Sequence, residues 1–140
     1  AIDLGVNLNF GNIGLTGYVY ASKGLGSTFR GGLFGTSATD GGINTTTGAE
    51  RDGDGGYLQA TYVIPSGTKL GVAYGVSSLD KASSTDTAHL DENERWTVGA
   101  YHPLTKHLNL VAEYNNVESK DHAGVNSEGD AVSIGAILFF

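Results

Sequence analysis

Strict alternation of apolar and polar residues is the feature of this 140-residue sequence that most limits its fold. Positions 2–10 read I-D-L-G-V-N-L-N-F, and positions 130–140 read D-A-V-S-I-G-A-I-L-F-F. Because successive side chains of a β-strand point to opposite faces, each segment predicts a strand with one entirely apolar face. In water, a flat apolar terminal strand favours edge-to-edge aggregation. A strand that faces lipid tolerates the same pattern, since its apolar side meets acyl chains.

The rest of the chain repeats this pattern, and the sequence predicts an all-β fold of about seven strands. The expected strands span 2–10, 13–22, 56–64, 69–77, 95–101, 108–115 and 130–140. Short turns at 11–12, 65–68 and 103–107 alternate with long polar segments at 23–55, 78–94 and 118–129. Many glycines, only two prolines and no helix-period spacing of apolar residues agree with this fold class. Alternation of short turns and long loops is typical of outer-membrane barrels, whose short turns lie on the periplasmic side.

Composition excludes several other classes of protein. The chain has no cysteine, which rules out a disulfide-stapled fold and thiolate metal sites. A net charge of −7 argues against a nucleic-acid partner, because such a partner requires a basic face. No apolar run approaches the length of about 18 residues that a transmembrane helix needs, and no signal peptide is recognisable, so we expect a mature or truncated chain. Residues 1–140 fit one domain.

The odd number of expected strands has a consequence for closure. If the first strand descends towards the periplasm, the last one descends too, whereas a complete bacterial barrel has an even number of strands. An open sheet in a bilayer would expose two edges of unpaired backbone groups, at a cost on the order of tens of kcal/mol in total. We therefore predict an antiparallel transmembrane β-barrel in which residues 1–140 form the C-terminal portion of one larger barrel domain. Alternatively, another chain supplies the missing strands.

Aromatic and charged residues agree with these strand directions. Aromatic residues fall at the two ends of the expected apolar faces, as interfacial girdles would. They are Phe10, Tyr62 and Phe140 at the periplasmic ends, and Trp96 and Tyr114 at the outer ends. Charged residues of the strands fall on the opposite face, where they avoid lipid. They are Asp3, Lys69, Arg95 and Glu113.

The polar faces supply the candidate functional residues. Either they line a water-filled lumen or they form the solvated face of a soluble sheet, and the uniformly apolar opposite face favours the lumen. The residues predicted to line it are Asn7, Asn9, Thr16, Tyr18, Tyr20, Gln59, Thr61, Arg95, Thr97, Tyr101, Glu113 and Asn115. Arg95, and to a lesser degree Lys69, are candidates for ion selectivity through the charged-ring logic of pores. Alternatively, both residues only keep the polar face hydrated.

Five phrases of the sequence match a known family. They are G-N-I-G-L-T-G-Y-V-Y at 11–20, R-D-G-D-G-G-Y-L-Q-A-T-Y at 51–62, T-K-L-G-V-A-Y-G at 68–75, L-N-L-V-A-E-Y at 108–114 and G-A-I-L-F-F at 135–140. With these phrases the chain resembles the C-terminal part of Gram-negative general-diffusion porins. Terminal phenylalanine by itself identifies only the wider class of outer-membrane barrels.

The resemblance implies a water-filled barrel of about 16 strands in the outer membrane of a Gram-negative bacterium. It implies passive diffusion of small hydrophilic solutes and ions, a homotrimer, and contact with outer-membrane lipid and lipopolysaccharide. It also implies that Phe140 acts as an assembly signal, read by the barrel-assembly machinery on the C-terminal strand. The part of the family that carries the inward-folded constriction loop has no counterpart in these residues.

Other chemistries find weaker support, and we predict no catalytic residue, metal or cofactor. The segment 52–56, D-G-D-G-G, suggests calcium by its clustered carboxylates but lacks the EF-hand spacing. The four histidines show no ligand spacing for zinc, no motif frames a nucleophile, and the glycine pair at 24–26 lacks the helix that phosphate binding needs. Two alternatives remain open: a small outer-membrane barrel with a structural or adhesive role through its loops, and a lipid-modifying barrel enzyme.

Overall fold

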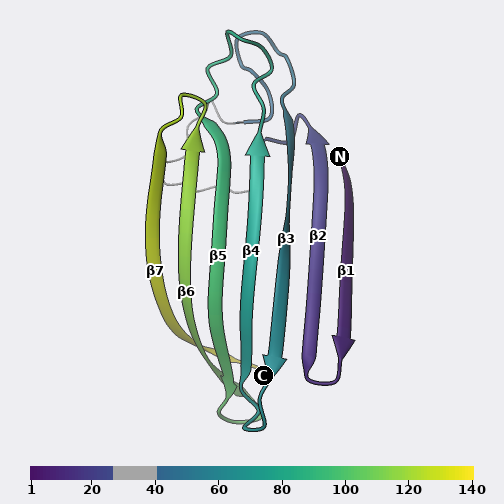
Figure 1. Ribbon diagram of the computed structural model, residues 1–140, viewed down its shortest axis with the longest axis vertical. Coiled ribbons are helices and arrows are strands. Elements are labelled where there is room, and N and C mark those ends of the chain that lie inside the picture. Colours follow the sequence, from purple (N-terminus) through teal and green to yellow (C-terminus); the bar gives the residue numbers. More distant parts are fainter. Residues whose placement is uncertain (27–40) are drawn as a thin grey trace.

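Seven antiparallel strands form one sheet in a computed structural model of the chain, which describes residues 1–26 and 41–140 (Figure 1). Neighbours in the sheet are neighbours in sequence, so the order is β1 to β7 without a crossover. The strands are β1 (Ile2–Phe10), β2 (Ile13–Lys23), β3 (Asp52–Val63), β4 (Lys69–Leu79), β5 (Leu90–Pro103), β6 (Leu108–Asp121) and β7 (Asn126–Leu138). The predicted all-β class and number of strands are confirmed.

Strand register keeps the two predicted faces continuous across the sheet. Phe10 of β1 lies opposite Ile13, Ile13 opposite Tyr62, and Tyr62 in turn opposite Leu70 of β4. Directly opposed residues in a sheet share a face. The apolar sides predicted strand by strand therefore merge into one surface, and the polar sides merge into the other.

Several strands reach further than the sequence predicted. The segments 78–94 and 118–129 were expected to be loops, but β5 begins at Leu90, β6 continues to Asp121 and β7 begins at Asn126. Likewise β3 begins at Asp52, inside the predicted first loop, and β7 ends at Leu138 rather than at the last residue. Apolar alternation fades in these outer segments, whereas backbone pairing needs only N–H and C=O groups, so it continues.

Tight turns join the strands at the end opposite the long loops (Figure 1). The first is Gly11-Asn12, as predicted, and the second spans residues 64–68. Gly11 has φ 59° and Gly67 has φ 83°. Both values lie in the left-handed region, which glycine adopts without steric cost, so these glycines suit the turns they occupy.

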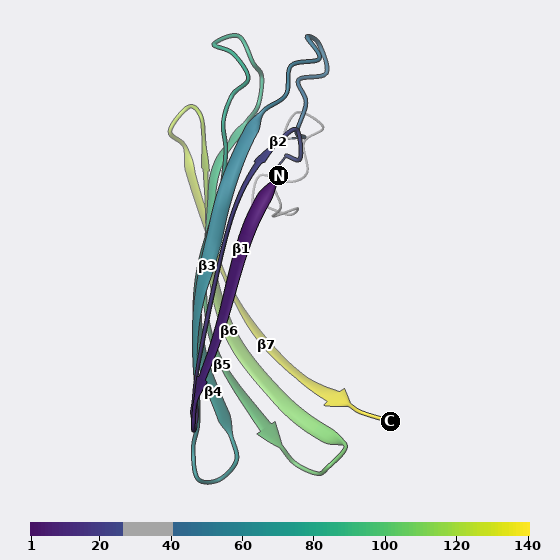
Figure 2. The same ribbon diagram turned by 90° about the vertical axis from the view of Figure 1, so that its right-hand side faces the viewer.

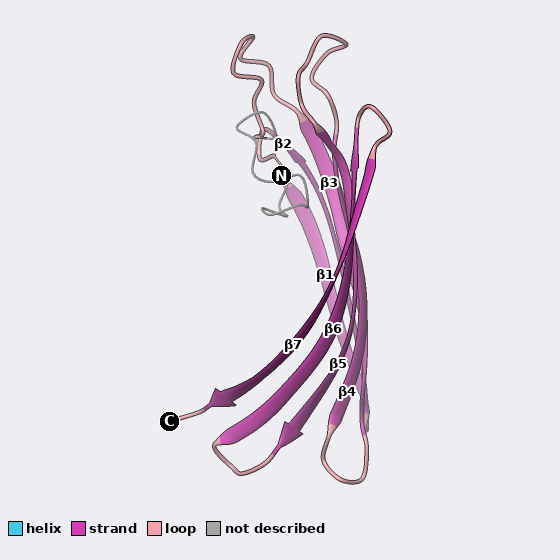
Figure 3. Cartoon of the chain, turned by 90° about the vertical axis from the view of Figure 1, so that its left-hand side faces the viewer, coloured by secondary structure: helices cyan, strands magenta, loops and turns pink. Residues whose placement is uncertain are grey.

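The sheet is curved, and its two faces differ in exposure in the opposite sense to a soluble domain (Figures 2 and 3). Along β4, the apolar Leu70, Val72 and Tyr74 are exposed, while Gly71 and Ala73 between them are half-buried. The polar face thus lies on the sheltered, concave side. Within the described residues, the buried apolar side chains are few: Leu79, Ala88 and Leu90, at the outer end of the sheet.

Both edge strands have a neighbour on one side only within the described chain. They run in the same direction, because an odd number of antiparallel strands separates the first from the last (Figure 1). The sheet is therefore open, with the outer backbone groups of β1 and β7 at its two edges. The parity argument from the sequence predicted this arrangement of the first and last strands.

Candidate functional site

The concave face collects every residue that the sequence predicted to line a lumen. Those of β1, β3, β5 and β6 occupy odd-numbered positions and those of β2 even-numbered ones, and the register aligns them on one side. For example, Asn7 lies opposite Thr16, and Thr16 lies opposite Gln59. The structure thus brings these side chains onto one surface that runs the length of the strands.

Amide and hydroxyl groups line the end of this face near the tight turns. Asn9 Nδ2 donates to Asn7 Oδ1 at 2.8 Å, and Asn7 Nδ2 donates to Thr16 Oγ1 at 2.7 Å. With Gln59 and Lys69, among others, they line a shallow hollow of about 540 Å³. Amide and hydroxyl groups can replace the hydrogen bonds that a hydrated solute makes to water, and they do so without a covalent bond or a metal ion.

The side-chain oxygen of Asn115 holds Arg95 in place on this face. Its Nε and Nη2 donate to Asn115 Oδ1 at 3.2 and 2.6 Å, and Thr97 Oγ1 donates to the same oxygen at 2.6 Å. Asn115 is itself buried, and Thr97 lies in register between it and Ala73. A guanidinium held through more than one N–H loses conformational freedom, so the cation has a defined position on the concave wall.

Two tyrosines on the concave face are packed over glycines. A Cβ added at Gly99 would lie 2.9 Å from the Tyr101 oxygen, and this hydroxyl donates to Glu113 Oε1 at 2.5 Å. The side chain of Tyr20 similarly crosses Gly55, and its hydroxyl lies 2.6 Å from Ser77 Oγ. The glycines let each ring lie close against the backbone, so the two side chains lie along the sheet rather than projecting away from it.

Tyr57 also belongs to this face, although it was not among the predicted site residues. Its ring centroid is 5.8 Å from that of Tyr18, which in turn is 6.2 Å from that of Tyr20. These separations are typical of interacting aromatic pairs. Period-two alternation already placed Tyr57 beside Gln59 and Thr61, so the sequence carried a signal for it.

A buried ion pair that joins two outer segments was not predicted from the sequence. Arg51 Nε and Nη2 donate to Asp86 Oδ2 and Oδ1 at 2.7 and 2.6 Å, and Arg51 Nη1 donates to the carbonyl oxygen of Gly41 at 2.6 Å. Both side chains are inaccessible, with exposures of 2% and 0%. The segment 41–51 was predicted to be part of a loop too polar to pack, and this is wrong for these residues, because the charges are paired.

Further donors complete the environment of Asp86. The amides of Ala82 and Ala88 donate to its carboxylate, and Asn44 Nδ2 donates at 2.8 Å. Hydrogen bonds from Arg51 hold the pKa of the Asp86 carboxyl well below its usual range, against the opposing effect of burial. The pair therefore joins residues 41–51 to the loop 80–89 as a charged, fully hydrogen-bonded contact, which we call the loop clamp.

On the convex face, aromatic side chains mark where the apolar surface ends. The rings of Trp96 and Tyr114 lie 5.1 Å apart. The hydroxyls of Tyr74 and Tyr114 donate outward to Glu94 and Asp130, both at 2.7 Å. Beyond them the convex face becomes polar and acidic, which explains why apolar alternation stops before the strands do. Aromatics with one apolar and one polar side suit a membrane interface.

The structure offers little to the metal interpretations. Within residues 1–26 and 41–140, no three His, Asp or Glu side chains gather closely enough to hold a metal ion. Asp52 and Asp54 lie on the convex side of β3, and Asp52 is 4.0 Å from the Lys23 ammonium. Among the same residues, no helix is long and apolar enough to cross a membrane.

The last predicted site residue, Phe140, lies beyond the end of β7 and is fully exposed. The backbone N–H of the preceding Phe139 donates to the His107 carbonyl at 2.8 Å, so hydrogen bonding to the β6 side continues to Phe139, one residue past the end of β7.

Comparison with known proteins adds no relative: no family model matches the chain, and neither a curated protein nor a solved structure is significantly similar to it.

Proposed function

We propose that this chain is the C-terminal part of an outer-membrane porin, which forms a water-filled channel for passive diffusion of small hydrophilic solutes and ions. One observation carries the proposal: apolar side chains are exposed on the convex face of the sheet, whereas most polar side chains of the inner strands β2 to β6 are half-buried or buried on the concave face. Water-soluble proteins show the reverse, because burial of apolar surface drives their folding. Lipid outside and water inside is the environment that suits both faces.

Selection of solutes by size and charge would follow from the same arrangement, without an energy source or a cofactor. The convex face contacts acyl chains up to the aromatic residues Tyr74, Trp96 and Tyr114, and the acidic surface beyond them contacts water or headgroups. The concave face gives hydrated solutes hydrogen-bonding partners along the path. Arg95 adds a fixed positive charge to the wall, which favours anions near it.

The remaining strands of the barrel would cover the two open edges. Because β1 and β7 run in the same direction, an odd number of further strands is needed to close the sheet with antiparallel pairs. A barrel of about 16 strands, as in the porins that the sequence resembles, meets this condition. We further propose a homotrimer in the outer membrane, surrounded by lipid and lipopolysaccharide, with Phe140 as the signal for the assembly machinery.

Planar-bilayer recordings of the full-length protein that contains these residues test the channel. We expect stable open-channel steps in potassium chloride. Arg95→Glu should shift the reversal potential in a salt gradient towards cation preference, and Arg95→Gln should shift it less, because it removes the charge without inverting it. Absence of open-channel steps would contradict the porin proposal, and unchanged reversal potentials would remove Arg95 from selectivity.

A small outer-membrane barrel with an adhesive role remains the second candidate, and the loop clamp is the observation in its favour. Arg51 and Asp86 hold two outer segments in a defined shape, as a recognition surface requires. Intact mass of the protein from its source separates the two candidates. A barrel of a few strands that adheres to a partner and conducts no ions would support this alternative.

A further inference from the structure

The concave side of β4 carries only small side chains along its middle. Gly71, Ala73, Gly75 and Ser77 occupy successive positions on this side. The neighbouring strands carry large side chains at the same level, because Gly75 lies opposite Tyr57 of β3 and opposite Arg95 of β5. The row Tyr57–Gly75–Arg95 therefore has two tall walls and a low floor.

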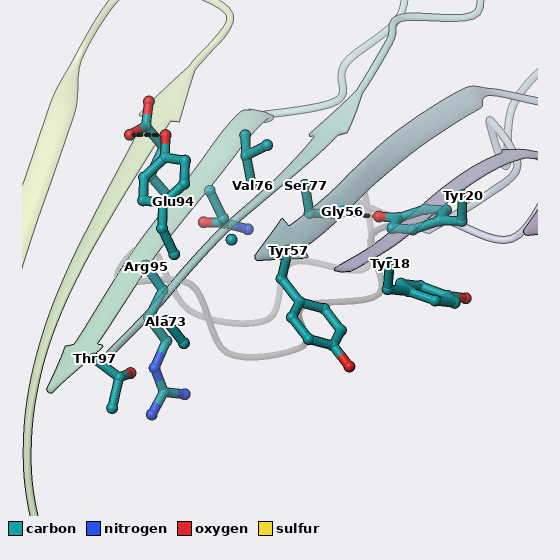
Figure 4. A pocket seen from close by; sticks show the side chains of 13 residues that line it. Tyr18, Tyr20, Gly56, Tyr57, Ala73, Val76, Ser77, Glu94, Arg95 and Thr97 are labelled. Carbon is teal, nitrogen blue, oxygen red and sulfur yellow. Dashed lines mark hydrogen bonds between the residues drawn. The ribbon is translucent and has the colours of Figure 1, made fainter. Parts of the chain in front are cut away.

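This depression is a defined hollow of about 290 Å³. Figure 4 shows Tyr57 and Arg95 projecting from β3 and β5 on either side of Ala73. Two strand spacings separate the walls by about 10 Å at the backbone. Aromatic rings pair with their centroids about 4.5–7 Å apart, so a single ring fits between Tyr57 and the guanidinium.

The chemistry of the hollow differs between its two walls. On one side, the rings of Tyr18 and Tyr57 offer an extended aromatic surface, and Gly75 and Ala73 leave the floor free of polar side-chain atoms. On the other side stands the positive charge of Arg95, fixed by Asn115. A ligand that suits both walls is flat and apolar at one end and negatively charged at the other.

Asn93 gives an independent indication that the hollow is built for a ligand. It lines the same hollow and is 3% exposed, and its Oδ1 accepts a hydrogen bond from Ser119. Its Nδ2 is buried and has no hydrogen-bond partner among the described residues. Buried donors are nearly always satisfied in proteins, so an unsatisfied one beside a cavity points to a missing acceptor.

We propose that this hollow, the tyrosine–arginine slot, is a binding subsite for small aromatic carboxylates on the lumenal wall. The residues that line the slot include Tyr18, Tyr57, Gly75, Asn93, Arg95 and Thr97. The ring of the ligand stacks on Tyr57 over Gly75, and its carboxylate meets the Arg95 guanidinium. Because the ligand reaches the slot from water inside a barrel, the inference rests on the proposed channel.

Channel recordings with organic anions test the slot in the full-length protein. Conductance is measured against concentration for potassium benzoate, with potassium acetate as the equally charged anion without a ring and potassium cyclohexanecarboxylate as the ring without π electrons. We expect benzoate conductance to saturate in the millimolar range, and that of the other two to rise almost linearly.

Variants assign the effect to the two walls. Arg95→Gln should raise the benzoate half-saturation concentration about tenfold, since a charge-assisted contact is lost. Tyr57→Leu should raise it about threefold, and Tyr57→Phe, which keeps the ring, should leave it unchanged. Lys69→Gln is the matched control, because it removes a positive charge from the same face outside the slot, and it should leave the half-saturation concentration unchanged.

The outcomes separate the slot from the channel. If the protein gives no open steps in potassium chloride, the proposed channel fails and the slot fails with it. If the channel conducts but benzoate conductance is as linear as that of acetate, the slot alone is wrong. Equal effects of Arg95→Gln and Lys69→Gln would likewise overturn it, because benzoate would then respond only to the net charge of the lumen.

Discussion

Two adjacent residues of β7 offer a direct test of the proposal that the convex face meets lipid. Ile134 points to the convex side and is 85% exposed, and Ser133 points to the concave side opposite Glu113. We consider arginine at each position, Ile134→Arg and Ser133→Arg. The two variants add the same side chain, one residue apart in the same strand, so strand propensity and net charge change almost equally.

The expected magnitudes follow from the two environments. Arginine on the lipid face of an outer-membrane barrel costs about 2–4 kcal/mol near the bilayer midplane. Arginine on the concave side remains in water, and the Glu113 carboxylate opposite is a favourable neighbour, so its effect should stay within about 0.5 kcal/mol. If the convex face were solvated instead, Ile134→Arg would also be a surface substitution with an effect within about 0.5 kcal/mol.

Reversible unfolding in urea, with the full-length protein inserted into phosphatidylcholine vesicles, measures the difference. Fluorescence of Trp96, which lies at the end of the apolar convex surface, reports insertion. We expect the free energy of unfolding to fall by about 2–4 kcal/mol for Ile134→Arg alone. Equal values for the two variants, or a larger loss for Ser133→Arg, would refute the assignment of the faces.

Three further predictions concern the loops and the concave wall. Asp86→Asn leaves the buried guanidinium of Arg51 without its counter-charge, so amide hydrogen exchange in residues 41–51 and 80–89 should accelerate about a hundredfold. The control Lys23→Gln breaks an exposed ion pair and should change the exchange rate less than about threefold. Because the guanidinium lowers the pKa of Asp86 in the folded state, the loop clamp should keep its stability down to about pH 4, the pKa of an unfolded aspartate, and lose it progressively at lower pH. A hydrogen-exchange rate, corrected for the intrinsic pH dependence of exchange, that already rises as the pH falls from about 7 to about 5 would contradict this. Gly99→Ala should displace the Tyr101 ring and cost about 1–3 kcal/mol in vesicle unfolding, whereas Gly135→Ala, where a Cβ meets nothing within 4 Å, should be nearly neutral.

Outer strand ends show where reasoning from the sequence is limited. Between Glu92 and Trp96 the convex side of β5 changes from acidic to aromatic, and apolar alternation begins only there. A pattern of side chains reports the environment of a strand and not its hydrogen bonds. The alternation in the sequence therefore located the end of the apolar surface, and the strand was predicted to end at the same point. In the structure, the backbone pairing of β5 with β6 continues beyond it to Leu90.

The sequence by itself determined the number of strands, their faces and the residues on the concave side. Each of these follows from a period of two, which is a local property that neighbouring residues express without distant partners. The alternation from Ile2 to Phe10 and from Val132 to Leu138 was sufficient for this, because the faces of a strand are fixed by its own geometry.

Only the tertiary structure decided which distant residues meet. Arg51 and Asp86 lie 35 positions apart, and Tyr20 reaches Ser77 across the intervening strand, 57 positions away. The slot between Tyr57 and Arg95 likewise exists because the register sets Gly75 between them. Register depends on turn lengths and on packing over the whole sheet, so contacts between strands are set by the sheet and not by any one segment.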